Sequence, residues 1–307
     1  MPEVLHGGFR LHYEVLGDPL GVPLVLVAGS GEQIGSVEFP SEQCALFLQR
    51  GFRVIRLDNR DAGLSVPIDP LPEFDVADAI ARGIPSPYTR MDMADDVIAV
   101  LDDLGIRSAH LVGASMGGFI ARWAAIRHPQ RVASLAILMS GAGGDPGDPT
   151  PQWERTALDH LLVLSRVLPR AEAIESAIEL WRYLWADGYP FEEAFVRERV
   201  TYAHDRAYRP QGFARHALSS VRSPGLWNAQ QAIRCPTLIL QGGRDPLFAE
   251  AHGSALQSRI RGSTLWLERR MGHALHRELW VPLADRVSAL AASAVRSPPP
   301  REAHRLP

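Results

Sequence analysis

The sequence has 307 residues, of which 46% are hydrophobic and 22% are charged. These values are typical of a globular protein with a large core, organised as one domain or as one domain with an insertion. The formal net charge is −3, and every basic residue is an arginine scattered along the chain, which argues against nucleic acid or an anionic membrane as a partner.

Neither the N-terminus nor the cysteines suggest export. The segment from Met1 to Arg10 lacks the basic start and apolar run of a signal peptide, and no apolar stretch is long enough to span a bilayer. Cys44 and Cys235 lie far apart and in no metal-like spacing, which favours two reduced thiols. We therefore expect a cytoplasmic protein that needs no metal or other cofactor, and nothing in the sequence indicates its oligomeric state.

Short apolar runs predict the strands of a sheet. Phe9 to Val15 alternates between apolar and polar residues, as an edge strand does. Leu24 to Ala28 is continuously apolar and too brief for a helix, which is typical of a buried parallel strand. Five further runs complete the predicted set: Phe52–Leu57, Ala109–Val112, Leu135–Met139, Thr237–Leu240 and Thr264–Leu267.

Helical patterns fall between these runs. They cover Ser41–Arg50, Met91–Leu104, Met116–Arg127 and Leu279–Val295. Strands that alternate with helices predict a mostly parallel sheet with helices on both faces, an α/β fold.

The alternation stops between Asp145 and Ala229. The segment Gly141–Pro151 is rich in Gly, Pro and Asp, and the following stretch is helical in character and holds eleven of the 23 aromatic residues. We therefore predict a core domain of residues 1–144 and 230–296, an inserted helical cap of residues 145–229, and a disordered tail of residues 297–307. A second irregular insert, Val66 to Arg90, holds five prolines and could border the same cleft.

The strongest motif is Gly113-Ala114-Ser115-Met116-Gly117, which matches the G-x-S-x-G nucleophile elbow. A predicted strand precedes it and a predicted helix follows, as the motif requires. Such a sharp turn strains the serine backbone and needs small neighbours, and the new helix directs its N-terminal N–H groups at the same point. We therefore predict that Ser115 is a catalytic nucleophile.

A serine hydroxyl needs a base to accept its proton, and in this arrangement the acid and then the histidine follow the serine along the chain. Asp245 follows one predicted strand, and His273 follows the next and precedes the final helix. Asp245 would hold the imidazole in one tautomer while His273 transfers the proton. His276 is an alternative base, His252 lies too soon after the acid to fit well, and Asp145 is an alternative acid.

Acyl transfer also needs hydrogen-bond donors for the oxyanion. The loop Ala28-Gly29-Ser30-Gly31 follows the first buried strand, and we expect the backbone N–H groups of Ser30 and Met116 to be these donors. The two glycines could instead serve only as flexible turn residues. The charged run after the strand Phe52–Leu57 is interpreted as a structural network centred on Arg60.

The segments VAGSG, VIRLDNRDAGLS, HLVGASMGG, PTLILQGGRDPLFAEAHG and MGHALH together resemble the aclacinomycin methylesterase-like branch of the α/β-hydrolases along nearly the whole chain. The resemblance implies a cap-covered esterase that cleaves a methyl ester from a polyketide-like substrate. It implies Ser115, Asp245 and His273 as the triad, with Ser30 and Met116 at the oxyanion. Such esterases often carry glycine at the position of Ser30, and the cap matches poorly, so the particular ester does not transfer.

The leading hypothesis is hydrolysis of a carboxylic ester of a small molecule, with a bulky apolar or aromatic group held beneath the cap. Trp181, Trp185 and Tyr189 lie near the centre of the cap and are the predicted pocket residues. Lactone opening, C–C bond hydrolysis and perhydrolysis could use the same triad. A protein of this fold that binds a small molecule without turning it over is the alternative from another class.

Overall fold

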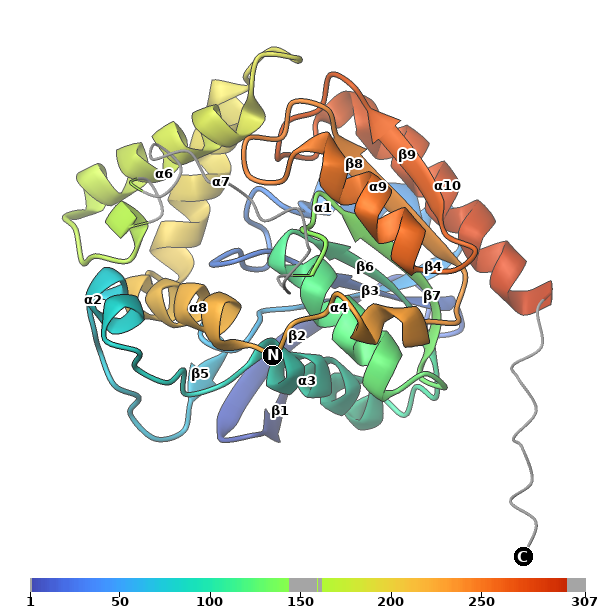
Figure 1. Ribbon diagram of the computed structural model, residues 1–307, viewed down its shortest axis with the longest axis horizontal. Coiled ribbons are helices and arrows are strands. Elements are labelled where there is room, and N and C mark those ends of the chain that lie inside the picture. The colour runs from blue at the N-terminus through green and yellow to red at the C-terminus, as the bar shows by residue number, and fades with distance from the viewer. Residues whose placement is uncertain (1, 144–158, 160–161, 297–307) are drawn as a thin grey trace, which may run out of the picture.

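The computed structural model describes residues 2–143, 159 and 162–296. Figure 1 shows a twisted sheet flanked by helices, with a further group of helices to one side of it. The alternative acid Asp145, the first part of the predicted cap and the predicted tail lie outside the described residues.

Nine strands of the described chain form one sheet in the order β1-β2-β4-β3-β6-β7-β8-β9, with β5 paired to β2. Their bounds are β1 (Glu3–His6), β2 (Phe9–Leu16), β3 (Val22–Val27), β4 (Phe52–Leu57), β5 (Val66–Pro67), β6 (Ala109–Ala114), β7 (Val132–Leu138), β8 (Thr237–Gly242) and β9 (Thr264–Glu268). The pairs that involve β2 are antiparallel, and all other pairs are parallel. The prediction of a mostly parallel sheet is confirmed.

The apolar run at β3 follows from burial on both sides of the sheet. Leu24 and Leu26 point into one hydrophobic core, and Val25 and Val27 point into the other. Because successive side chains of a strand alternate between faces, a strand covered on both faces must be apolar at every position.

Helices cover both faces, as the alternating pattern predicted. The core that holds Leu24 also holds residues of α1 (Ser41–Leu48) and α10 (Arg277–Arg296). The core that holds Val25 also holds residues of α3 (Arg90–Asp103), α4 (Met116–Arg127) and α9 (Glu250–Arg259).

Several short elements were not predicted from the sequence. The first strand β1 pairs with β2 through a turn at Gly7 and Gly8, which have φ values of 52° and 79°. A Gly-Gly pair between two alternating segments is a hairpin signal, so β1 could have been found. The segments α2 (Val76–Ala81), α9 and the 3-10 turn η1 (Ala229–Ala232) carry weaker signals because they are short or lack a clear apolar stripe.

The second half of the predicted cap is helical. It forms α6 (Arg170–Trp185), α7 (Glu193–Arg206) and α8 (Pro210–Arg222), which we call the cap helices. They lie together at the left of Figure 1, where α8 packs beside α2. The apolar side of α6 and part of α7 join the same core as Leu24, so these two helices pack against the core domain rather than standing apart from it.

No helix in the described part of the chain is both long and apolar enough to cross a membrane.

Candidate active site

Ser115 sits at the turn between β6 and α4 with backbone angles φ 52° and ψ −118°. This positive φ is strained for a non-glycine residue and is expected at a nucleophile elbow. The neighbouring glycines make room for the turn. A Cβ atom at Gly113 would lie 2.2 Å from the Gly117 carbonyl oxygen, and one at Gly117 would lie 2.0 Å from the Val27 carbonyl oxygen. Only glycine therefore fits at these two positions.

Ser115, His273 and Asp245 form one chain of hydrogen bonds. The distance from His273 Nε2 to Ser115 Oγ is 2.9 Å, and the distance from His273 Nδ1 to Asp245 Oδ2 is 2.8 Å. Because a carboxylate only accepts, the proton of a neutral His273 lies on Nδ1 and leaves Nε2 free to accept the serine proton. The geometry brings together the three residues that the sequence placed in separate loops.

The carboxyl group of Asp245 is held on both oxygens. Its Oδ1 accepts hydrogen bonds of 2.8 Å from the backbone N–H groups of Leu247 and Phe248. Its Oδ2 contacts His273 and also accepts from Gln241 Nε2 at 3.3 Å. These contacts fix the carboxylate, so it can orient the imidazole without rotating away.

The loop that carries His273 is fixed by the end of cap helix α6. The backbone N–H of His273 donates to the Leu184 carbonyl oxygen at 2.7 Å. A Cβ atom at Gly272 would lie 2.5 Å from the carbonyl oxygens of both Leu184 and Trp185, so glycine is required before the histidine. The position of the base therefore depends on the docking of α6.

His276, the alternative base, is fully buried away from the cavity. Its ring packs at 4.7 Å from the Trp185 ring centroid and 4.5 Å from that of Tyr189. Its Nε2 accepts a hydrogen bond of 3.3 Å from the Gly272 N–H, and burial, aided by Arg270, lowers its pKa to about 4. These contacts describe a packed, neutral histidine. His252 is also engaged, since its Nδ1 accepts from the Ala142 N–H at 3.1 Å.

The loop after β3 is held on either side of Ser30. The Gly29 N–H donates to Glu38 Oε2 at 2.7 Å, and the Gly31 N–H donates to His216 Nδ1 at 3.1 Å. The Ser30 hydroxyl donates to the sulfur of Met116 at 3.3 Å, so the side chains of these two residues are in contact. Among the hydrogen bonds of the described residues, none uses the Ser30 N–H, so this donor can serve a bound oxygen.

Two glutamates lie beside this loop. A Cβ atom at Gly29 would lie 3.1 Å from Glu38 Oε1 and 3.2 Å from Ser115 Cβ. The Glu38 carboxyl and the Ser115 side chain therefore both lie close to Gly29. Glu32 Oε2 accepts from the Glu38 N–H at 3.0 Å. Burial and the nearby charge of Glu32 raise the pKa of Glu38 to about 8, so Glu38 is mostly neutral at pH 7.

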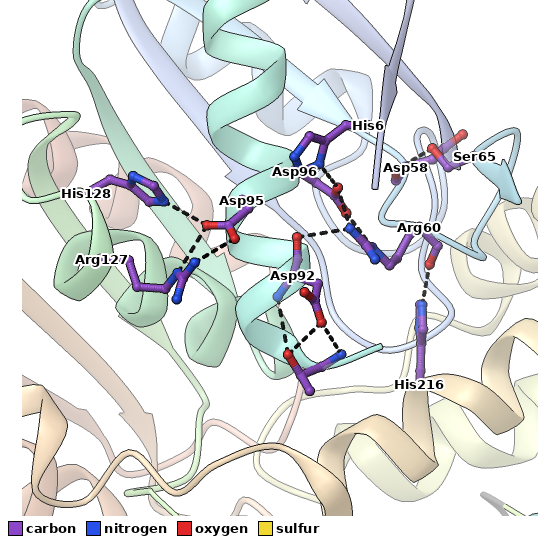
Figure 2. A network of polar contacts seen from close by, with 11 residues as sticks. His6, Asp58, Arg60, Ser65, Asp92, Asp95, Asp96, Arg127, His128 and His216 are labelled. Atoms are coloured by element: carbon purple, nitrogen blue, oxygen red, sulfur yellow. Dashed lines mark hydrogen bonds and ion pairs between the residues drawn. The ribbon is translucent and has the colours of Figure 1, made fainter. Parts of the chain in front are cut away.

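The Arg60 network expected from the sequence is present (Figure 2). The Arg60 guanidinium donates to both oxygens of Asp96 at 2.6 Å, and His6 Nδ1 lies 2.7 Å from Asp96 Oδ1. The Arg60 carbonyl accepts from His216 Nε2 at 2.6 Å. The network thus joins β1, the loop after β4, α3 and cap helix α8, and through His216 it reaches the loop that carries Ser30.

A cavity of about 530 Å³ opens above Ser115. This volume is ordinary for a small-molecule site. The described residues that line it come from the loops after the parallel strands and from all three cap helices, and most are apolar. They include Ser30, Glu38, Arg90, Ser115, Met116, Phe119, Trp181, Val200, Phe213, Phe248 and His273.

Of the three aromatic residues predicted to line the pocket, Trp181 does so. Trp185 and Tyr189 are not among the lining residues, and this part of the expectation is corrected. Trp185 is 1% exposed, and its Nε1 donates to the Pro190 carbonyl at 2.9 Å. Trp185 and Tyr189 instead enclose His276, because they lie on parts of the cap that face the His273 loop.

Three residues near the cavity were missed by reasoning from the sequence: Glu38, Arg90 and His216. Glu38 lies in a loop, Arg90 begins a helix and His216 lies within the cap, so none belongs to a recognisable motif. Of these three, only Arg90 was indicated by the sequence, because it ends the irregular insert Val66 to Arg90, which was expected to border the cleft.

The sequence profile described as alpha/beta hydrolase fold matches residues 22–278 of this chain. Rhodomycin D methylesterase of Streptomyces sp. (strain C5) is 30% identical over 295 residues, which covers 90% of this chain and 93% of that protein. The rhodomycin D methylesterase of Streptomyces peucetius is 29% identical over 293 residues, with the same coverage of 90% and 93%.

Among solved structures, an esterase from Rhodococcus sp. ECU1013 superposes with a TM-score of 0.73 at 22% identity, covering 95% of this chain and 98% of that chain. At this identity the likeness concerns the fold alone. The fold that the profile describes agrees with the observed sheet, which is mostly parallel with helices on both faces. The chain therefore belongs to the α/β-hydrolase fold family.

Proposed function

We propose that this protein is a serine esterase that hydrolyses a carboxylic ester through an acyl-enzyme on Ser115. One observation carries the proposal: the unbroken hydrogen-bond chain from Ser115 Oγ through His273 to Asp245, with distances of 2.9 Å and 2.8 Å, at the floor of a largely apolar cavity. A protein that only binds its ligand has no need of this geometry.

In the proposed reaction Ser115 Oγ attacks the ester carbonyl carbon, and its proton passes to His273 Nε2. The N–H groups of Ser30 and Met116 stabilise the negative oxygen of the tetrahedral intermediate. The C–O bond to the alcohol then breaks, and His273 returns the proton to the departing alcohol. Water attacks the acyl-enzyme in the same manner, which releases the acid and restores the serine.

We infer a methyl ester of a bulky, polyketide-like acid as the substrate. The two curated relatives at about 30% identity are rhodomycin D methylesterases, and the present chain spans 93% of the length of each. A cavity of about 530 Å³ suits a large acyl group better than a short one. Residues 145–229 would form the cap over this group, and a cytoplasmic location stays a prediction from the sequence.

The proposal is tested with p-nitrophenyl and methyl esters and with a serine-directed phosphonate. Ser115→Ala and His273→Ala should each lower kcat by several orders of magnitude, because the two residues act as one unit. Ser115→Ala should also abolish phosphonate labelling. Folding should be unchanged, since the serine hydroxyl contacts the cavity rather than the core.

Two variants serve as matched controls. Ser220→Ala removes another serine that lines the cavity and should leave phosphonate labelling intact. His276→Gln alters the alternative base and should retain most of the activity. A Ser115→Ala protein that keeps more than about a tenth of the wild-type turnover would exclude this mechanism, because loss of such a nucleophile costs about a million-fold.

A further inference from the structure

Arg90 is a buried arginine that lines the cavity and has few partners. Arg90 is 6% exposed. Among the described residues, only Nη2 finds an acceptor, the Ser220 carbonyl oxygen at 2.8 Å, and the buried Nε has none. Within the described part of the chain no carboxylate pairs with Arg90. Burial lowers its pKa to about 10, which leaves the guanidinium charged at neutral pH.

A second arginine nearby shows what full pairing looks like in this fold. The guanidinium carbons of Arg90 and Arg122 lie 4.2 Å and 4.5 Å from the ring centroid of Phe119. The Arg122 guanidinium donates to Gly118, Ala142, Gln230, Ser140 and Gly141. Arg122 is thus satisfied by the protein, whereas most of the donors of Arg90 are unused.

The position of Arg90 in its helix also opposes stability. Arg90 is the first residue of α3, where the helix dipole disfavours a positive charge. The nearest acid in the first turn, Asp92, is engaged by the N–H and the hydroxyl of Thr89, each at 2.7 Å. A buried charge is costly unless it is paired with an opposite charge. The contacts with Phe119 and the Ser220 carbonyl offset only part of this cost, so the fold maintains a cation without a carboxylate partner beside the cavity.

We propose that Arg90 binds a carboxylate on the acyl part of the substrate, so that the enzyme selects esters of acids that carry a second acidic group. This inference rests on the proposed function, because it names the class of ester that the same site takes. The planar guanidinium matches the two oxygens of a carboxylate, and in an apolar cavity this pairing is stronger than in water.

The length of the acyl chain should decide how well the substrate reaches Arg90. Arg90, Phe119 and Ser115 line the same cavity, and the Arg90 guanidinium lies over the Phe119 ring. The carboxylate should therefore bind within this cavity while the ester carbonyl lies at Ser115. Monoesters of dicarboxylic acids with four to eight carbons vary the chain length and allow the optimum to be measured.

The experiment compares p-nitrophenyl monoesters of such dicarboxylic acids with neutral p-nitrophenyl esters of the same chain length. Wild-type enzyme should prefer the carboxylate ester, adipate over hexanoate for example. Arg90→Met keeps the packing on Phe119 and removes the charge. It should lower kcat/KM for the carboxylate esters about 10- to 100-fold, mainly through KM, because a charge-assisted hydrogen bond is lost. The loss of kcat/KM for the neutral esters should be much smaller, so the ratio of the two kcat/KM values, which is the carboxylate preference, should fall.

Three further measurements separate this role from a structural one. Arg90→Lys keeps a point charge and should retain part of the preference. Thermal unfolding of Arg90→Met should show only a small change in melting temperature, because the cost of the buried charge is removed together with its contacts to the Ser220 carbonyl and the Phe119 ring. Arg82→Met removes an exposed arginine that pairs with Asp78 and should leave the preference unchanged, which controls for net charge.

A binding measurement makes the outcome independent of turnover. Calorimetry with adipate should show binding to Ser115→Ala and much weaker binding to the double variant Ser115→Ala, Arg90→Met. If wild-type enzyme cleaves no ester and the phosphonate does not label Ser115, the proposed function fails while the binding result still tests Arg90. An unchanged carboxylate preference in Arg90→Met, or equal adipate binding by the two calorimetry proteins, would overturn the inference.

Discussion

The Gly31 N–H, in the loop after β3, donates a hydrogen bond of 3.1 Å to Nδ1 of His216, a residue of cap helix α8 that lies 185 positions later in the sequence. Since Nδ1 accepts, the proton of the imidazole is on Nε2, which donates to the Arg60 carbonyl. Burial lowers the pKa of His216 and favours this neutral form. One histidine thus connects the cap, the Arg60 network and the loop that carries Ser30.

Replacing His216 should impair the reaction rather than the affinity. His216→Leu removes the acceptor of the Gly31 N–H, so the neighbouring Ser30 N–H is no longer held toward the oxyanion. We expect kcat to fall about 10- to 100-fold with little change in KM, which is less than the roughly 100- to 1,000-fold cost of losing an oxyanion donor outright, because the Ser30 N–H is displaced rather than removed. Steady-state kinetics with a p-nitrophenyl ester measure both constants.

The matched variant is His216→Asn, whose side-chain oxygen can occupy the place of Nδ1. It should restore part of kcat while lacking the bond to the Arg60 carbonyl. If His216 were purely structural, the fall in kcat of each variant would instead follow its loss of thermal stability, and His216→Asn would have no kinetic advantage over His216→Leu.

Glu38→Gln should preserve activity at neutral pH. The pKa of Glu38 is raised to about 8 by burial and by Glu32, so glutamine resembles the protonated acid and can still accept from the Gly29 N–H. The same substitution should stabilise the protein at high pH. Thermal unfolding between pH 5 and pH 9 checks this, with Glu250→Gln as an exposed control on α9.

The direction in which stability changes with pH follows from proton binding. A carboxyl whose pKa is higher in the folded than in the unfolded protein binds more protons when folded, so its contribution to stability falls as pH rises from 4.5 through about 8. The difference in melting temperature between Glu38→Gln and wild type should therefore grow over this window. A constant difference would contradict the raised pKa.

His276 should make the protein sensitive to acid. Burial lowers the pKa of this histidine to about 4, so the unfolded chain binds a proton that the folded chain excludes as pH falls below about 6.5. Up to roughly 3 kcal/mol of stability should be lost between pH 6.5 and pH 4. His276→Gln can still accept from the Gly272 N–H and should show a smaller loss, as measured by unfolding in urea at each pH.

The stability that His6 contributes should change with pH in the opposite direction to that of His276. Its hydrogen bond to Asp96 raises the pKa of His6, so the stability from this contact is present below pH 6.5 and is lost as pH rises. His6→Gln should therefore remove stability in acid and have less effect above neutrality. Equal pH profiles for the two variants would show that neither imidazole governs the acid response.

The three cap aromatics should separate into two classes. Trp181→Ala should change KM and the rank order of short and bulky esters, because Trp181 lines the cavity. Trp185→Ala and Tyr189→Ala should instead lower the free energy of unfolding by about 3–5 kcal/mol with unchanged ester preference, since these rings pack around His276. A shift in preference in all three variants would mean that the pocket extends to His276.

Local patterns were sufficient for the framework of this protein. The inner parallel strands are buried on both faces and are therefore mostly apolar, which makes runs such as Leu24–Ala28 visible without a structure. The elbow is equally local, because a tight strand-to-helix turn around Ser115 demands glycine at fixed offsets. The α/β-hydrolase fold and the family were therefore predictable from the sequence.

The side chains that surround the site depended on tertiary packing. The sequence indicates that Trp181, Trp185 and Tyr189 lie close together, but only the docking of α6 on the His273 loop decides that one faces the cavity and two face His276. Glu38, Arg90 and His216 acquire their roles from partners on other elements. Their burial and hydrogen bonds depend on contacts between segments far apart in the chain, which no local pattern encodes.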